Sequence, residues 1–98
     1  MRERTIEKHL IKRAKACGGD AFKTVSPGFK GFPDRLVCIP HRDQWGVPSY
    51  PRVFLVETKA PKGKLSEVQK RAHARIRNVG GAVYTVYTKE EVDAFFDF

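Results

Sequence analysis

The segment VFLVETK, residues 53 to 59, limits the possible folds of this 98-residue chain more than any other feature. Its first four residues are apolar, so a strand here would carry hydrophobic side chains on both faces. A strand of that kind is typical of the middle of a sheet that is covered on both sides. The segment therefore predicts a layered α/β fold, in which helices flank a central sheet.

Six further elements surround this strand, and Gly and Pro residues separate them. Apolar residues at helical spacing predict three helices, each beginning after a capping residue: Thr5, Ser66 and Thr88. Apolar runs predict three more strands, at residues 21–25, 34–39 and 82–87. The segments 26–33 and 40–52 are expected to be loops. The predicted order is α, β, β, β, α, β, α.

The size of the chain predicts one domain, residues 1–98. With 41% hydrophobic residues it can bury a single core, and it has no apolar run long enough to span a membrane. The first twenty residues interleave charged and apolar positions, which argues against a secretory signal and favours a cytoplasmic protein. In a reducing compartment Cys17 and Cys38 are expected to be unpaired, buried, small side chains.

The net charge of +8 predicts a polyanionic partner. Residues 1–88 hold 18 basic against 7 acidic side chains, whereas the last ten residues hold 1 against 4. Nucleic acid would therefore contact the first part of the chain. The cations expected to do so are Lys30, Lys62 and Lys64, which flank the candidate site described next, and Arg71 of the second predicted helix. A basic surface that serves solubility alone remains an alternative.

Glu57 and Lys59 lie two residues apart on the central strand and therefore on one face. They are a simple ion pair at a strand end, or they face a site that binds a cation and an anion together. Asp34 follows a Gly-Phe-Pro turn and opens the preceding strand, so it could converge with Glu57, although it could also be only a turn residue. A set of carboxylate and carbonyl oxygens suits Mg²⁺ or Mn²⁺.

Two further polar residues border the inward faces of the predicted helices. Glu7 precedes Leu10 and Ile11 by one turn, but an acid in the first turn also interacts favourably with the helix dipole. Gln69 lies at the edge of the inward face of the second helix, but it is also the third residue of a capping box with Ser66. Each therefore has a functional and a structural interpretation.

Taken in order along the chain, these motifs resemble the VRR-NUC domain, the virus-type replication-repair nuclease family of the PD-(D/E)xK superfamily. The resemblance covers nearly the whole chain. It rests on the helix glutamate Glu7, the Gly-Phe-Pro-Asp turn ending at Asp34, the Glu57 and Lys59 pair, the Gly-Lys-Leu-Ser segment at 63–66, and Gln69. It implies a restriction-endonuclease-like core, with a mixed sheet flanked by helices in the order αβββαβα.

The resemblance also implies a metal-dependent phosphodiesterase that acts on DNA. Asp34, Glu57 and the main-chain carbonyl of Thr58 would hold Mg²⁺ or Mn²⁺, and Lys59 would orient or activate the attacking water. Glu7 would assist through metal-bound water, and Gln69 would position the substrate phosphate or the lysine. No organic cofactor is expected.

By resemblance to stand-alone viral members, the expected substrate is branched DNA such as a four-way junction or a flap, and the expected assembly is a homodimer. Two alternatives remain open: a non-catalytic DNA-binding module, and an interaction subunit of a replication or repair complex. An RNA-directed nuclease is a weaker third.

The segment 40–52, with Trp45 and Tyr50, would stack on bases, cover a dimer interface or fold back on the domain. The histidines and cysteines show no zinc-ligand spacing.

Overall fold

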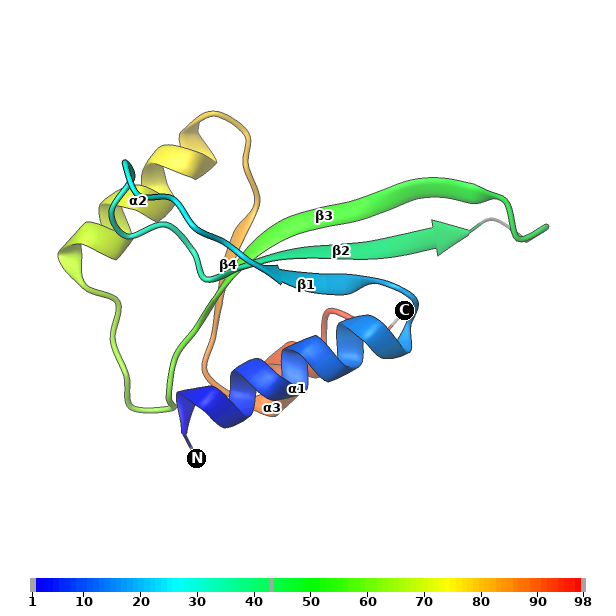
Figure 1. The fold of residues 1–98 in the computed structure, drawn as a ribbon, viewed down its shortest axis with the longest axis horizontal. Coiled ribbons are helices and arrows are strands. Elements are labelled where there is room, and N and C mark those ends of the chain that lie inside the picture. Colours follow the sequence, from blue (N-terminus) through cyan, green and yellow to red (C-terminus); the bar gives the residue numbers. More distant parts are fainter. Residues whose placement is uncertain (1, 43, 98) are drawn as a thin grey trace.

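The computed structural model describes residues 2–42 and 44–97, and the side chains of residues 48–51 lie outside the described part. A four-stranded sheet is flanked by three helices (Figure 1). In chain order the elements are α1 (Glu3–Ala16), β1 (Asp20–Lys23), β2 (Arg35–Arg42), β3 (Pro48–Thr58), α2 (Glu67–Asn78), β4 (Val83–Val86) and α3 (Lys89–Asp93). The predicted α/β class and element order are confirmed.

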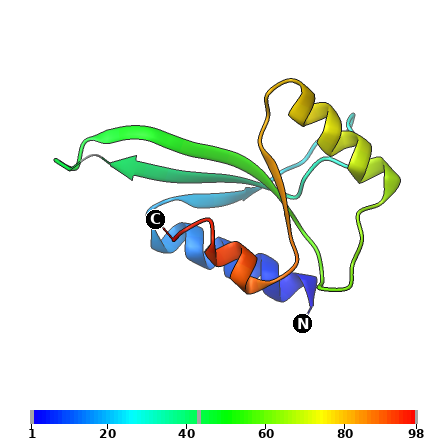
Figure 2. The ribbon, with the colours of Figure 1, turned by 180° about the vertical axis from the view of Figure 1, so that it is seen from behind.

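The sheet is mixed, with the strands in the order β1-β2-β3-β4. The first three strands pair antiparallel, and β4 pairs parallel to β3. The parallel pair is connected through α2, which crosses to the opposite side of the sheet from α1 and α3 (Figure 2). The C-terminal part of β3 is therefore the most enclosed part of the sheet. It carries Glu57, and Lys59 follows directly after its last residue.

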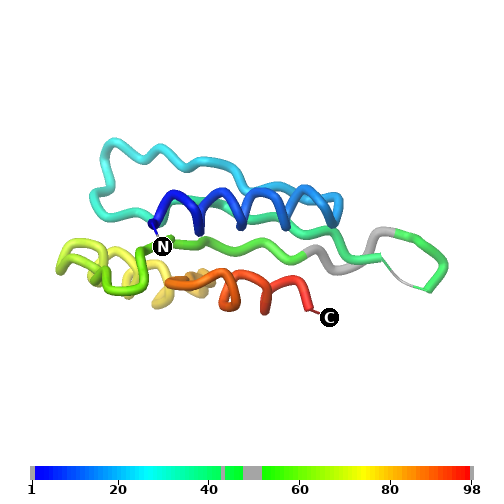
Figure 3. The backbone as a smooth tube through the Cα atoms, turned by 90° about the horizontal axis from the view of Figure 1, so that it is seen from below, coloured from blue at the N-terminus to red at the C-terminus, as the bar shows by residue number. Residues whose placement is uncertain are grey.

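The hydrophobic core lies between the sheet and the pair α1 and α3, which run side by side (Figure 3). Ile6, Leu10 and Ala14 recur every four residues along α1, and all three are fully buried. They pack with inward-facing residues of the sheet, of which Val37 and Val56 are fully buried. An ion-pair cluster fastens the two helices, because Asp93 accepts bonds from His9 at 2.6 Å and Arg13 at 2.7 Å.

Helix ends follow the predicted signals with one exception. α1 and α2 each end in two glycines, and Gly18 and Gly80 have φ of +88° and +91°. In each case the two glycine N–H groups bond back to carbonyls of the last turn, which is the Schellman arrangement. The start of α1 differs: the helix begins at Glu3, and Arg2 rather than Thr5 is its N-cap residue, without a side-chain cap. Its first N–H groups are accessible to water, so the helix does not need that cap.

The segment 40–52 is not a loop, as the sequence had suggested. β2 and β3 continue through it as a hairpin arm that extends beyond the other strands (Figure 1). Prolines argued against strands here, but this part of the hairpin has free outer edges, where a missing N–H costs nothing, and Pro40 lies at a register irregularity. Trp45 is 77% exposed at the end of the arm. The expected contacts of Tyr50 concern a side chain that lies outside the described part of the structure.

Two smaller expectations have different outcomes. Both cysteines are free, as expected, but Cys17 is exposed and Cys38 only half-buried, so the prediction of burial is wrong for Cys17. Cys17 lies at the end of α1, just past the turn that faces the core. Across residues 2–42 and 44–97, no helix has both the length and the apolar character needed to cross a membrane.

Candidate active site

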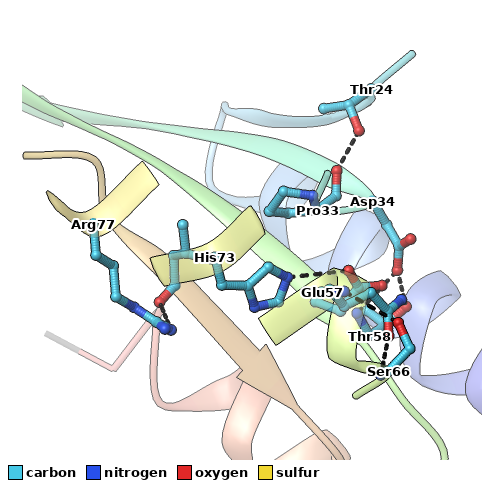
Figure 4. A network of polar contacts seen from close by, with 10 residues as sticks. Thr24, Pro33, Asp34, Glu57, Thr58, Ser66, His73 and Arg77 are labelled. Carbon is cyan, nitrogen blue, oxygen red and sulfur yellow. Dashed lines mark hydrogen bonds and ion pairs between the residues drawn. The ribbon is translucent and has the colours of Figure 1, made fainter. Parts of the chain in front are cut away.

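The ends of β2 and β3 bring two carboxylates together. Arg35 pairs with Val56, so the next pair of that register sets Asp34 opposite Glu57. Thr58, the residue after Glu57, holds the Asp34 side chain in place. Asp34 Oδ2 accepts bonds from the Thr58 N–H at 3.0 Å and from the Thr58 hydroxyl at 3.1 Å (Figure 4). The predicted convergence of Asp34 and Glu57 is therefore a property of the sheet register.

The turn before Asp34 is held against α2 by a glycine. Gly31 has φ of +83°, and a Cβ there would lie 2.6 Å from the carbonyl oxygen of Val68. Both observations exclude a larger residue without a shift of the backbone. Gly31 therefore lets the turn pack on the first turn of α2, and this contact positions Asp34 relative to that helix.

Glu57 is 1% exposed, and its environment disfavours the negative charge. Burial raises the pKa of Glu57 from its ordinary 4.5 to about 8, and the hydrogen bond and charge of Asp34 act in the same direction. Lys59 opposes this shift with its positive charge, and Glu3 adds a smaller increase. The pKa of Glu57 thus reports a site in which two acids are crowded together beside one lysine.

His73 of α2 is the buried neighbour of Glu57. Its Nε2 lies 3.4 Å from Glu57 Oε1, and Figure 4 shows the ring directed from α2 toward that carboxyl group. Burial and the charges of Arg77 and Lys59 lower the pKa of His73, whereas the charge of Asp34 raises it. Burial thus disfavours the charged form of both groups in this contact.

A divalent cation fits this donor set. Asp34 and Glu57 supply carboxylate oxygens, and a cation would offset both the burial and the Asp34 charge that raise the pKa of Glu57. The Thr58 N–H points toward β2, so the Thr58 carbonyl points the same way, toward Pro33 in the extended register. Proline has no N–H to donate. The Thr58 carbonyl therefore receives no ladder bond from that residue, which suits a metal ligand. Within the described residues, no three His, Cys, Asp or Glu side chains cluster as a metal site.

Lys59 acts on Glu57 through its charge, whereas the recorded bonds of Gln69 are those of the capping box. The Lys59 N–H bonds to the Val86 carbonyl at 2.9 Å, which anchors its backbone to β4. The side chain of Gln69 accepts a bond from the Ser66 N–H at 2.9 Å, and the backbone N–H of Gln69 donates to the Ser66 hydroxyl at 3.1 Å. The capping box predicted from the sequence is therefore confirmed, and a catalytic role of Gln69 stays a prediction.

Glu7 contacts Arg35, the residue that follows Asp34. Its carboxylate accepts a bond from Arg35 Nε at 3.4 Å, and Arg35 also donates to the Ala21 carbonyl. Glu3, one turn earlier on α1, is the helix acid whose charge reaches Glu57. The sequence interpretation did not include Glu3, Arg35 or His73. Helical spacing contained a signal for two of them, since Glu3 precedes Glu7 by four residues and His73 follows Gln69 by four.

The four predicted DNA-binding cations fall into two groups. Lys30 and Arg71 line one pocket beside α2, whereas Lys62 and Lys64 are exposed on the segment between β3 and α2.

Residues 2–90 match the family model of the VRR-NUC domain. The chain belongs to the VRR-NUC family. This VRR-NUC domain is 39% identical over 90 residues to the protein "Putative nuclease p44" of Acyrthosiphon pisum secondary endosymbiont phage 1, covering 92% of this chain and 87% of that protein. It is also similar to a solved structure described as a VRR_NUC domain, with a TM-score of 0.76 and 32% identity over 96% of this chain and 92% of the other. The resemblance inferred from the motifs is confirmed, and membership supports a nuclease.

Proposed function

We propose that this VRR-NUC domain is a DNA endonuclease that depends on Mg²⁺ or Mn²⁺ and hydrolyses phosphodiester bonds. One observation supports the proposal above all others: Asp34 and Glu57 meet at the ends of paired strands, with Lys59 on the same face as Glu57. The name of the similar phage protein, a nuclease, agrees with this chemistry. The basic charge of the domain suits a polyanionic substrate.

Asp34, Glu57 and the Thr58 carbonyl would hold the cation. When bound, the cation supplies Lewis-acid activation of the phosphoryl group and of the attacking water. Asp34 enters the site already oriented by its two bonds from Thr58. Glu57 would bind the cation as the carboxylate, since a positive charge beside it favours the ionised form.

Lys59 would orient the water and stabilise the negative charge that develops on the phosphate. Its half-buried position strengthens that interaction relative to bulk water. Gln69 would position the phosphate or the lysine from the N-terminal turn of α2. Glu7 would act on water at the edge of the site, from its position beside Arg35.

Lys59→Ala tests the assignment. Labelled four-way-junction, flap and linear duplex DNA are incubated with wild type and variant in Mg²⁺, Mn²⁺ or EDTA. We expect cleavage that requires metal and that falls by about 10²- to 10³-fold in Lys59→Ala, at an unchanged Tm. Lys23→Ala, which removes an exposed lysine from β1, is the charge-matched control and should cleave like wild type.

Other outcomes point to the rival functions. DNA binding without product in either metal would identify a DNA-binding module, and cleavage of a parallel RNA substrate alone would identify a ribonuclease. An isolated chain that is unfolded or inactive until a partner is added would identify an interaction subunit.

We further propose that the domain cuts branched DNA as a homodimer. A 98-residue domain buries a limited area, and two paired sites would address two strands. Sedimentation at several protein concentrations, with and without a four-way junction, measures the assembly. A monomer that cleaves a junction at full rate would rule out the dimer as the active form.

A further inference from the structure

A pocket of about 350 Å³ lies between the turn that precedes Asp34 and the outer side of α2. Three cations surround it: Lys30, Arg71 and Arg75. Its remaining side chains are apolar, from Phe29, Val68 and Ala72, and no acidic residue lines it. The volume is that of a small ligand site.

Aromatic contacts hold one of the cations in place. The guanidinium carbon of Arg75 lies 4.8 Å from the centre of the Phe29 ring, and Phe29 packs edge to face on Phe32 at 5.6 Å. Gly31, packed on the Val68 carbonyl, ties the same turn to α2. Stacking on a ring leaves the N–H edge of a guanidinium able to donate. Arg75 and the turn are therefore held in place before any ligand enters.

The charge of the pocket is not compensated by protein. In the described part of the chain, no carboxylate pairs with Lys30, Arg71 or Arg75. The acid nearest along α2, Glu67, pairs instead with Lys70 at 3.2 Å. Three converging cations with no acid between them favour an anion, and guanidinium groups suit phosphate in particular.

The pocket borders the carboxylate site without including it. On α2, Val68, Ala72 and Arg75 form one stripe, and Gln69 and His73 lie one residue later, about 100° around the helix. His73 contacts Glu57, whereas its neighbour Ala72 lines the pocket. Lys30 precedes Asp34 by four residues. The same helix and the same turn thus contribute neighbouring residues to both sites.

We propose that this pocket binds a phosphodiester group of the substrate strand next to the one that is cut. The inference rests on the proposed nuclease function and deepens it, because it assigns a separate site that holds the strand. Arg71, Arg75 and Lys30 contact the non-bridging oxygens, and Phe29 keeps Arg75 oriented toward them.

The side-chain Nε–Hε signals of Arg71 and Arg75 give a direct test by NMR. The wild-type protein in EDTA is titrated with a four-nucleotide thymidine oligonucleotide, and then with the same oligonucleotide in which every link is an uncharged methylphosphonate. We expect both arginine signals to shift with the first ligand and to stay in place with the second. No shift, or equal shifts with both ligands, would overturn the proposal.

Variants measure the contribution to longer DNA. Arg71→Gln with Arg75→Gln removes two charges from the pocket, and Lys12→Gln with Lys15→Gln removes two exposed charges from α1. In EDTA, the salt dependence of binding to labelled junction DNA should fall by about 2 in the slope of log K against log salt for the pocket variant only. Equal losses in the two variants would show a general charge effect and refute the pocket.

Failure of this proposal is distinct from failure of the nuclease. Metal-dependent cleavage with no response of Arg71 and Arg75 refutes only the pocket. Arginine shifts in a protein that never cleaves DNA would leave the pocket standing and refute the nuclease.

Discussion

The two faces of the sheet use burial for different purposes. The face toward α1 and α3 is apolar, and Val37 and Val56 are completely inaccessible there. The face toward α2 buries Glu57 and His73, which are both 1% exposed, yet leaves Phe22 and Val53 more than half exposed. The same strand, β3, contributes alternate residues to both faces.

The difference separates stability from chemistry within one small domain. Apolar burial on the first face supplies the free energy of folding. On the second face, burial raises the pKa of Glu57 and lowers that of His73, which costs stability. The helix α2 creates this polar environment, and the core on the opposite face compensates for its cost.

Leu10→Ala should have the largest effect on stability, because it truncates a side chain of the core on the apolar face. Leu10 is fully buried in α1, so its truncation should lower the free energy of unfolding by about 2–5 kcal/mol. Chemical denaturation measures the change. Val53→Ala, on the exposed part of the second face, is the control and should stay within about 0.5 kcal/mol of wild type. Equal effects of the two variants would contradict the proposed division of the faces.

Glu57→Gln should have the next largest effect on stability, and it tests the polar face toward α2. Because the pKa of Glu57 is raised to about 8, the folded protein keeps a proton that the unfolded chain loses near pH 4.5. In EDTA, the contribution of Glu57 to stability is present below pH 4.5 and is lost as the pH rises to about 8.

The variant cannot lose that proton, so its Tm should exceed that of wild type at pH 8 and approach it at pH 4.5. A gain of about 4 °C or more would correspond to ~1 kcal/mol in a domain of this size. A Tm difference that is the same at every pH would contradict the raised pKa.

Substitutions in the capping box of α2 should have the smallest effects. Ser66→Ala removes the acceptor of the Gln69 N–H and should cost about 1 kcal/mol in thermal or chemical unfolding. Gln69→Glu keeps an acceptor for the Ser66 N–H, so its stability should equal that of wild type, while cleavage should fall if Gln69 positions substrate or Lys59. Unchanged cleavage would leave Gln69 with its structural role alone.

Local signals predicted much of the fold because the bonds concerned are local. The capping box of Ser66 and the paired glycines after each of the two long helices involve residues within five positions of one another. The hairpin arm was missed, since its prolines are unfavourable in most strands and tolerated only at an open edge. The start of α1 was placed three residues late because Thr5 looks like a cap, while the actual cap residue makes no side-chain bond.

The sequence by itself determined the order of the elements and the set of candidate site residues, including Asp34, Glu57 and Lys59. These depend on residue type, spacing and the alternation of side chains along a strand. Only the tertiary structure decided how those residues behave. His73 reaches Glu57 across 16 positions and Thr58 holds Asp34 across 24, and the pocket at Arg71 and Arg75 needs a turn from elsewhere in the chain. Burial and charge are set by everything packed around a group, so the pKa of Glu57 belongs to the fold rather than to the motif.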